Sequence, residues 1–422
     1  MKNYVSIVLS CFIFLSCKKD FEAPVPDTSW DLFESSSTFL NTYTRQGLEG
    51  VYNIKDGASA FGTLAAAKWS YTIENSDTTY HLSFFCENQV SYFICEGKRL
   101  DSNILLNGYW RKMVNTETGK IRLMIKPADG ARQLLNSIPI NTGDSIIISG
   151  NYGSGENTPD QPIKLKYLRP LYKATPLQIV AHRGGGSTAD LLPASENSVN
   201  MIKLASRFGA TGIEIDVRKT SDGEFVLFHD ATLNERLIQK NGLIGPIENY
   251  SYAQLSSLVR LEQGEKIPTL REALQTVVYN TPLEYVWLDT KFNGTLEKLR
   301  SIQSEFMQKA AALSRKLEIT IGIPDRNVLA NFLSLPGYQN TPSVCELDPA
   351  DVEKANSRIW APRFTLGLQN EAVEQIHAQG RRAFVWTLDV PQNVYEYMTQ
   401  GKFDGILSNY PSIVAYYYYV QP

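Results

Sequence analysis

Charged and histidine side chains stand at the ends of several apolar runs in the second half of the chain. His182 and Arg183 follow a run that begins at Gln178, and His229 ends a run that begins at Phe225. Two of the four histidines of the chain therefore occupy such positions. A pair of histidines can supply a base and an acid near neutral pH, since the ordinary imidazole pKa is about 6.5. The planar donors of Arg183 suit a phosphate group.

Three carboxylates lie inside further apolar runs. Glu214 and Asp216 are two residues apart, and Asp289 stands two residues before Lys291. Because side chains alternate along a strand, each pair points to one face of its strand. Several carboxylates in a protein interior are costly unless a positive charge neutralises them. The pattern predicts one divalent cation with oxygen ligands, Ca²⁺ or Mg²⁺, and Lys291 as a further phosphate contact.

Alternating strand and helix patterns must position these residues. After residue 176 the alternation predicts a parallel sheet covered by helices, and eight strands would close a TIM barrel with its site at the carboxyl ends of the strands. Taken in chain order, the run ending at His229 is the third strand and the run carrying Asp289 is the fourth. One candidate is surplus, and the sequence leaves open which lies outside the barrel. The candidates are 178–182, 212–217, 225–229, 285–290, 319–323, 343–347, 359–364, 383–388 and 405–407.

The first half of the chain has a different pattern. Short aromatic and β-branched runs separated by turn-forming residues predict an all-β domain over 43–172, either a sandwich or a lipocalin-like barrel. The barrel with the candidate site is expected over 173–422. The all-β domain presents no catalytic constellation, and its single histidine, His81, is expected to be partly exposed on a strand.

The amino terminus resembles a bacterial lipoprotein signal. Lys2 precedes an apolar run from Val5 to Leu15, which is too short for a membrane-spanning helix, and Cys17 follows a small residue. We expect residues 1–16 to be a signal peptide, Cys17 to be lipidated, and 17–42 to be a tether. The protein would then be exported and anchored to the bacterial cell envelope through its lipid. An ordinary secretory signal with an incidental cysteine is the alternative.

The composition of the chain argues against one class of function, nucleic-acid binding. The chain has 422 residues, 43% of them hydrophobic, and a formal net charge of −3. The absence of a basic bias argues against nucleic acid as a partner. No pattern in the sequence identifies a protein partner.

A set of short motifs is spaced along the second half of the chain. They are Ala-His-Arg-Gly at 181–184, Ser-Glu-Asn-Ser at 195–198, Gly-Ile-Glu-Ile-Asp-Val at 212–217, Thr-Ser-Asp-Gly at 220–223 and Val-Leu-Phe-His-Asp at 226–230, with shorter ones at 232–234, 267–270, 386–387, 404–406 and 409–411. Together they resemble the motifs of the glycerophosphodiester phosphodiesterase family, and the resemblance covers nearly all of 177–412. It implies a TIM barrel and a metal-dependent, two-histidine hydrolysis of glycerophosphodiesters to sn-glycerol 3-phosphate and an alcohol.

The resemblance also implies roles for individual residues. It places the metal on Glu214, Asp216 and Asp289, where the family usually has Glu at the third position. It assigns His182 and His229 to catalysis and Arg183 and Lys291 to the substrate phosphate. Asp389 replaces a usual Asn. Substrate or supporting contacts are expected from Glu196, Asn197, Trp386 and Asp389.

Two other functions remain open from the sequence. Phospholipase D toxins of the sphingomyelinase type share a related barrel and would act on intact phospholipids. A barrel without turnover could instead bind a phosphodiester or another ligand at the cell surface, and the Asp at 289 leaves room for that alternative.

Overall fold

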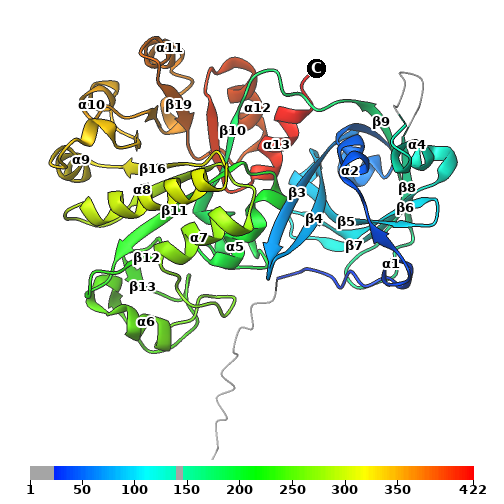
Figure 1. Cartoon of the computed structure of the whole chain (residues 1–422), viewed down its shortest axis with the longest axis horizontal. Coiled ribbons are helices and arrows are strands. Elements are labelled where there is room, and N and C mark those ends of the chain that lie inside the picture. Colours follow the sequence, from blue (N-terminus) through cyan, green and yellow to red (C-terminus); the bar gives the residue numbers. More distant parts are fainter. Residues whose placement is uncertain (1–22, 139–145) are drawn as a thin grey trace, which may run out of the picture.

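Two closed β-sheets organise the chain (Figure 1). The computed structural model describes residues 23–138 and 146–422. An antiparallel sheet occupies the first part of this range and a parallel one the second. Cys17 and the predicted signal peptide lie outside the described residues, so export and lipid anchoring stay predictions. In the described part of the chain, no helix has the length and apolarity needed to cross a membrane.

The antiparallel sheet closes on itself. Its described strands follow the order β1-β5-β4-β3-β2-β9-β8-β7-β6, and a further pairing of β5 with β6 completes the circuit. Of the two predicted forms of the all-β domain, the barrel is therefore the observed one. The strands are β1 (Thr38–Phe39), β2 (Gly50–Asp56), β3 (Leu64–Glu74), β4 (Asp77–Cys86), β5 (Ser91–Leu100), β6 (Asn103–Lys112), β7 (Thr118–Ile125), β8 (Ile147–Tyr152) and β9 (Gln161–Arg169), with helices α1 (Asp31–Glu34), α2 (Thr42–Leu48), α3 (Ala58–Phe61) and α4 (Ala131–Leu135).

The predicted tether, residues 17–42, extends too far into the chain. Residues 31–34 form α1, and β1 pairs with β5 through Thr38↔Arg99 and Phe39↔Lys98. Phe33 is buried and stacks under the ammonium group of Lys98. Residues 20–40 are polar and contain Pro24, Pro26 and Ser35 to Ser37, which is typical of a linker, and this composition gave no sign of the few contacts that anchor the segment.

The second sheet is the predicted TIM barrel, which the structure confirms. Strand β10 pairs in parallel with both β11 and β20, which closes the described strands into an eight-stranded ring. The strands are β10 (Gln178–Ala181), β11 (Gly212–Lys219), β15 (Tyr285–Thr290), β16 (Glu318–Ile323), β17 (Ser343–Cys345), β18 (Ile359–Trp360), β19 (Arg382–Val385) and β20 (Gly405–Ser408), and the surrounding helices are α5 (Val199–Ala205), α7 (Leu270–Asn280), α8 (Glu297–Ala312), α9 (Arg326–Leu333), α10 (Pro349–Lys354), α11 (Asn370–Ala378), α12 (Pro391–Gln400) and α13 (Pro411–Tyr419).

The surplus strand is the run from Phe225. It forms β12 (Phe225–Leu227), which pairs antiparallel with β11 and is not part of the ring. The chain then makes an excursion over 228–268 with its own apolar cluster before α7 returns to the barrel. The excursion contains β13 (Thr232–Leu233), β14 (Gly245–Pro246) and α6 (Tyr252–Leu258). The predicted order of the strands was therefore wrong in one place. Asp289 lies on β15, which is the third strand of the ring rather than the fourth. His229 follows β12, which forms a hairpin with β11 outside the ring.

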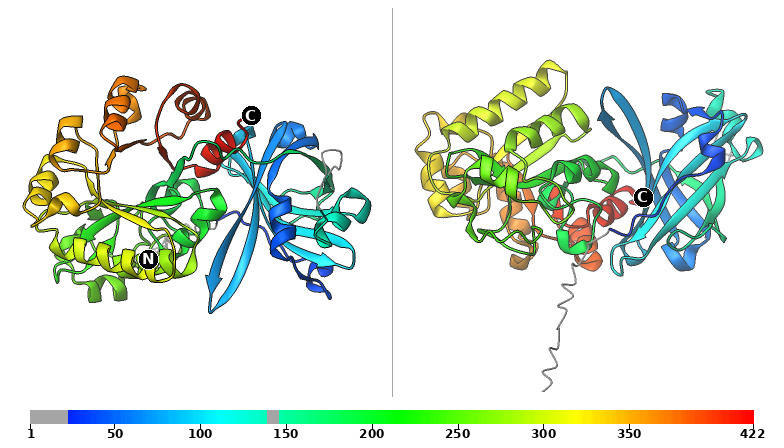
Figure 2. Two further views of the ribbon diagram at one scale, coloured as in Figure 1. Left: turned by 45° about the horizontal axis from the view of Figure 1, so that its top comes forward. Right: turned by 90° about the horizontal axis from the view of Figure 1, so that it is seen from below.

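The two barrels share a hydrophobic core. Strand side chains alternate, so Phe84 points into the antiparallel barrel while Phe85 packs outward against the TIM barrel. Helix α13 lies between the two sheets in both views (Figures 1 and 2). Nearly every residue of α13 is buried because protein covers all of its faces. The β domain is therefore packed firmly against the barrel.

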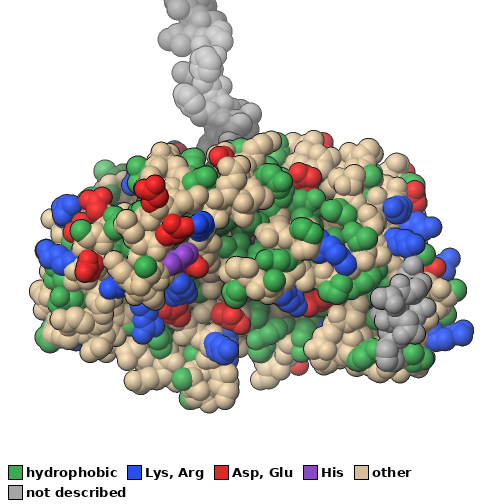
Figure 3. All heavy atoms as spheres, turned by 90° about the horizontal axis from the view of Figure 1, so that it is seen from above, with side chains coloured by type: hydrophobic (Ala, Val, Ile, Leu, Met, Phe, Trp, Pro, Cys, Tyr) green, Lys and Arg blue, Asp and Glu red, His purple; other side chains and the backbone are tan. Residues whose placement is uncertain are grey.

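Charged side chains of both signs are scattered over one face of the molecule. On the face shown in Figure 3, acidic and basic side chains lie among neutral and hydrophobic ones. This distribution agrees with the net charge of −3.

His81 is buried at the contact between the barrels. Its side chain, on β4 of the antiparallel barrel, is only 4% exposed, whereas the sequence predicted partial exposure. The difference arises because the TIM barrel covers this face. Burial and the nearby positive charge of Arg207 lower the pKa of His81 to about 3. Protonation of His81 is therefore unfavourable in the folded state.

This histidine should make the fold sensitive to acid. The unfolded chain binds a proton near pH 6.5 and the folded chain does not, so stability is present above that pH and is lost as the pH falls toward 3. At about 1.4 kcal/mol per pH unit, the loss between pH 7.5 and 5 is about 2 kcal/mol. Denaturant unfolding should show this loss in the wild type, and His81→Leu should lack it. Equal pH dependence of the two proteins would contradict the assignment.

Candidate active site

Neighbouring strands bring the predicted carboxylates together. Strands β11 and β15 pair in parallel, with Asp216 beside Asp289 and Glu214 beside Trp287. Ile213 belongs to the core beneath the helices, so alternation turns both acidic side chains of β11 into the ring. Ligand atoms of Glu214, Asp216 and Asp289 all lie within 4.8 Å of one another.

Each carboxylate has one anchored oxygen and one without a hydrogen-bond donor. Glu214 Oε2 accepts from the backbone N–H of Arg183 at 2.8 Å, and Asp216 Oδ2 accepts from Asn197 Nδ2 at 2.7 Å. Asp289 Oδ2 lies 2.6 Å from Lys291 Nζ. Their other oxygens are buried and lack a hydrogen-bond partner among the described residues, and Lys291 Nζ lies 3.4 Å from that of Asp216 as an ion pair. Three converging oxygens left in this way fit a divalent cation with oxygen ligands.

Confinement of like charges perturbs the acidic groups. Burial and the charges of Asp216 and Asp289 raise the pKa of Glu214 well above its ordinary range. Burial also raises the pKa of Asp289, against the opposing effect of Lys291. For Asp216, burial is outweighed by Lys291 and the histidines, and its pKa is lowered. One lysine does not neutralise three buried carboxylates, and a bound cation would remove the remaining repulsion.

His182 follows β10 and is held in one tautomer. Its Nδ1 lies 2.9 Å from Asn409 Oδ1, and Asn409 donates to Asp389 through Nδ2 at 2.7 Å and through the backbone N–H at 2.8 Å. Because a carboxylate only accepts, the amide nitrogen faces Asp389 and the amide oxygen faces His182. His182 Nδ1 must then carry the proton, which leaves the lone pair on Nε2. This nitrogen lies 3.8 Å from Glu214 Oε2.

The environment of His182 also favours the neutral ring. Burial, followed by the charge of Arg183, lowers the pKa of His182 to about 4. The ring is therefore uncharged near pH 7 and able to accept a proton.

His229 reaches the site from the excursion after β12 rather than from a strand of the ring. Its Nδ1 lies 2.7 Å from Asp230 Oδ1, and its Nε2 lies 3.1 Å from Arg183 Nη2. Arg218 on β11 donates to the carbonyl oxygens of His229 and Lys291. One arginine of the barrel wall thus fixes the backbone of both functional candidates.

Arg183 lies between the two histidines. Its Nη1 donates to Glu196 Oε1 at 2.9 Å, and its Nε is buried without a hydrogen-bond partner among the described residues. Glu196 is 2% exposed and also accepts from Arg236. Arg236 in turn donates to Asp230 at 2.7 Å. Glu196 therefore orients two arginines, whereas Asn197 orients Asp216.

The remaining predicted residues lie at the same end of the barrel. Trp386 follows β19, donates to the carbonyl oxygen of Ala361 at 2.8 Å, and stacks under Arg363 with 4.7 Å between the guanidinium carbon and the ring centroid. Asp389 supports Asn409, as described above. The structure thus places every predicted site residue that it describes at the carboxyl end of the barrel.

Sequence reasoning missed four residues of this site: Glu346, Asn409, Arg236 and Arg218. Glu346 directly follows β17, and burial together with Asp289 raises its pKa well above the ordinary range. The rule that found Asp289, a carboxylate at the carboxyl end of a strand, would also have found Glu346. Asn409 was part of a quoted motif but received no role. Arg236 gave no signal, since the excursion has no counterpart in strand periodicity.

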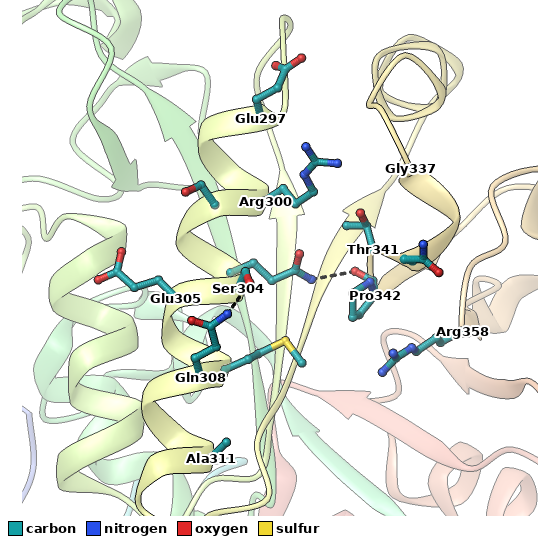
Figure 4. A pocket seen from close by; sticks show the side chains of 14 residues that line it. Glu297, Arg300, Ser304, Glu305, Gln308, Ala311, Gly337, Thr341, Pro342 and Arg358 are labelled. Atoms are coloured by element: carbon teal, nitrogen blue, oxygen red, sulfur yellow. Dashed lines mark hydrogen bonds between the residues drawn. The ribbon is translucent and has the colours of Figure 1, made fainter.

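A separate groove lies elsewhere on the barrel. It has a volume of about 990 Å³ and separates α8 from the segment that leads into β17 (Figure 4). Gln303 Nε2 donates across it to the carbonyl oxygen of Pro342 at 2.8 Å. Pro342 and Arg358 immediately precede β17 and β18, so the groove is at the amino ends of the strands, opposite the carboxylates.

Comparisons with known proteins agree with this geometry. Residues 182–413 match the model of the Glycerophosphoryl diester phosphodiesterase family. A glycerophosphodiester phosphodiesterase of Caldanaerobacter subterraneus subsp. tengcongensis is 26% identical over 241 residues, which are 55% of this chain and 94% of that protein.

Two further proteins extend the comparison. Glycerophosphodiester phosphodiesterase 1 of Homo sapiens is 32% identical over 149 residues, 34% of this chain but only 42% of that protein. The crystal structure of a glycerophosphodiester phosphodiesterase from Parabacteroides distasonis is 21% identical, covers 57% of this chain and 96% of that one, and has a TM-score of 0.46. The family match begins at residue 182, after the antiparallel barrel.

Proposed function

This chain belongs to the glycerophosphoryl diester phosphodiesterase family and is a phosphoric diester hydrolase, and on that premise we propose that it hydrolyses glycerophosphodiesters to sn-glycerol 3-phosphate and an alcohol. The observation that carries the proposal is the group of three carboxylates with unpartnered oxygens, next to His182, His229 and Arg183.

Glu214, Asp216 and Asp289 would hold one divalent cation, Ca²⁺ or Mg²⁺. When bound there, a cation of this kind would stabilise the negative charge that builds on the phosphate in the transition state. Asn197 and the backbone of Arg183 orient two of these carboxylates. Lys291 partly balances their charge and stands within reach of the same phosphate.

His182 is the proposed base. Its Nε2 carries the lone pair and points toward the carboxylates, so it can take a proton from the attacking oxygen. The new bond forms between that oxygen and phosphorus, and the bond from phosphorus to the alcohol oxygen breaks. The attacking oxygen comes from water, which gives glycerol 3-phosphate directly, or from the glycerol hydroxyl of the substrate. In the second case the alcohol leaves from a cyclic glycerol phosphate, and water must then open the ring, with the proton transfers reversed, to give glycerol 3-phosphate.

His229 is the proposed acid that protonates the departing alcohol oxygen. Asp230 Oδ1, at 2.7 Å from Nδ1, orients the ring so that Nε2 faces the site. Arg183 would bind the nonbridging phosphate oxygens through its unpartnered Nε and its Nη2, while Glu196 keeps the guanidinium in place.

The substrate class can be tested directly. Glycerophosphocholine and glycerophosphoethanolamine would be offered to the purified protein beside lysophosphatidylcholine, with glycerol 3-phosphate detected by a coupled dehydrogenase. We expect release from the glycerophosphodiesters, loss of release in Asp216→Asn, and full release in Asp222→Asn, which lies in the turn before β12 outside the site. Turnover of the lysophospholipid alone would contradict the proposed substrate.

Asp289 should contribute to cation affinity. Asp289→Asn keeps the shape of the side chain and removes one of three buried charges, so the dissociation constant for Ca²⁺ or Mg²⁺ should rise at least about tenfold. Titration calorimetry on the metal-stripped protein measures this change, with Asp222→Asn as the control. Unchanged affinity in Asp289→Asn would exclude Asp289 as a ligand.

A further inference from the structure

A buried arginine of the antiparallel barrel reaches into the TIM barrel. Arg111 on β6 is 0% exposed, although arginine is almost never fully buried unless it is paired. Its Nη1 donates to the carbonyl oxygen of Leu191 at 2.8 Å, and its Nη2 donates to the carbonyl oxygen of Asp190. Both acceptors lie in the loop that follows His182 and Arg183.

The partners of Arg111 are unusual for a buried cation. Within the described residues it forms no ion pair, and the two successive backbone carbonyls are its hydrogen-bond acceptors. A buried charge that loses its hydrogen-bond partners is strongly destabilising. A movement of the loop that breaks these two hydrogen bonds is therefore unfavourable. Here they define the path of the loop backbone at Asp190 and Leu191.

That loop does not hold its shape by local preference alone. Leu191 has φ 53° and ψ 42°, a left-handed conformation that is unfavourable for a residue with a side chain. A non-glycine residue stays in this region only when surrounding contacts determine it. The two hydrogen bonds from Arg111 are such contacts, and they come from outside the TIM barrel.

One route leads from this loop to Arg183. The backbone N–H of Thr188 donates to Glu196 Oε2 at 2.9 Å, and Thr188 Oγ1 accepts from the backbone N–H of Glu196 at 3.2 Å. Glu196 Oε1 then accepts from Arg183 Nη1 at 2.9 Å. A displaced loop would therefore misplace the guanidinium that is proposed to bind phosphate.

A second route leads to His182. Asp190 Oδ1 accepts from the hydroxyl of Tyr410 at 2.8 Å. Tyr410 is the neighbour of Asn409, whose side chain fixes the tautomer of His182. The same loop is thus also connected to the proposed base.

We propose that Arg111 is a positioning residue, and that the antiparallel barrel is a structural part of the active site rather than an independent module. Arg111 fixes the 188–191 loop, and the loop fixes Arg183 through Glu196 and His182 through Tyr410 and Asn409. The kinetic part of this inference rests on the proposed phosphodiesterase function. The structural part does not.

Replacement of Arg111 tests the kinetic part. In the full chain, Arg111→Met should lower kcat on glycerophosphocholine at least about tenfold, because misplacement of catalytic groups by even about 1 Å is costly. KM should change less than kcat. Arg111→Lys, which can still donate to a carbonyl, should recover most of the loss, and the pH profile should keep its shape because His182 and His229 are intact.

Ser83→Ala is the matched control. Ser83 on β4 donates from the same barrel across the same interface to the carbonyl oxygen of Arg207 at 2.7 Å, but Arg207 is outside the site. We expect Ser83→Ala to lower the melting temperature without lowering kcat. Equal losses of kcat in Arg111→Met and Ser83→Ala, or a kcat of folded Arg111→Met within about twofold of the wild type, would overturn the inference.

Hydrogen exchange tests the structural part without activity. Amides of 187–198 and of 409–410 should exchange faster in Arg111→Met than in the wild type, and at the wild-type rate in Ser83→Ala. If Arg111→Met does not fold, Tyr410→Phe interrupts the second route at a partly buried hydroxyl and should lower kcat in the same way. A wild type without phosphodiesterase activity would refute the proposed function, whereas unchanged exchange in the loop would refute the positioning role.

Discussion

Glu214→Gln should lower kcat/KM for glycerophosphodiesters at least about a thousandfold. The substitution keeps the size of the side chain and an oxygen for the N–H of Arg183, but it removes one buried charge from the three-carboxylate group. Charge stabilisation by a bound metal contributes several kcal/mol, and about 1.4 kcal/mol corresponds to a tenfold change in rate. Steady-state kinetics at saturating Ca²⁺ or Mg²⁺ measures the effect.

The control for this substitution is Glu318→Gln. Glu318 also lies on a strand of the ring, but it begins β16 at the end away from the site, where it pairs with Arg382 and Arg358. Its replacement should leave kcat/KM within about threefold of the wild type, since it removes only partly exposed ion pairs. A folded Glu214→Gln enzyme with more than a tenth of wild-type activity would contradict the metal assignment.

Removal of either histidine should lower kcat at least about a hundredfold, the lower range for general acid–base catalysis. His182→Ala removes the proposed base, and His229→Ala removes the proposed acid. His377→Ala is the matched control, because His377 is also paired with a carboxylate, Asp404 at 2.8 Å, but lies at the opposite end of the barrel. Losses below about tenfold at both positions would contradict the two-histidine mechanism.

The state of His182 adds a pH dependence. Its pKa is lowered to about 4 by burial and Arg183, so the neutral, proton-accepting form prevails at pH 7 and disappears as the pH falls toward 4. We therefore expect the acid limb of the kcat/KM profile to lie below the ordinary histidine pKa of about 6.5. An acid limb at or above pH 6.5 would indicate a different titrating base.

The catalytic half of the chain was largely predictable from its sequence. Apolar runs indicated the strands of the ring, and the rule that active sites lie at their carboxyl ends favoured Glu214, Asp216 and Asp289. The direction of β12 was not predictable, because an apolar run of three residues has the same pattern whether its neighbour is parallel or antiparallel. His229 was therefore found in sequence but assigned to the wrong kind of element.

The contacts between the two barrels could not be predicted from the sequence. His81 and Arg111 stand in strand patterns where polar residues normally face water, and only the presence of a second barrel makes these faces interior. Arg236 and Glu196 illustrate the same difficulty inside the site, since residues 40 positions apart meet through the excursion after β12. Short motifs indicate which residues are near the end of a strand. They do not indicate which distant loops pack against those residues.

Phosphorus NMR of glycerophosphocholine tests the central claim most directly. The metal-stripped wild type would be mixed with substrate, first with EDTA and then with excess Ca²⁺ or Mg²⁺. We predict that the phosphodiester resonance persists with EDTA and is replaced by that of glycerol 3-phosphate only after metal is returned. Undiminished hydrolysis by the stripped enzyme, or no glycerol 3-phosphate from folded protein with either metal, would contradict the proposed metal-dependent phosphodiesterase.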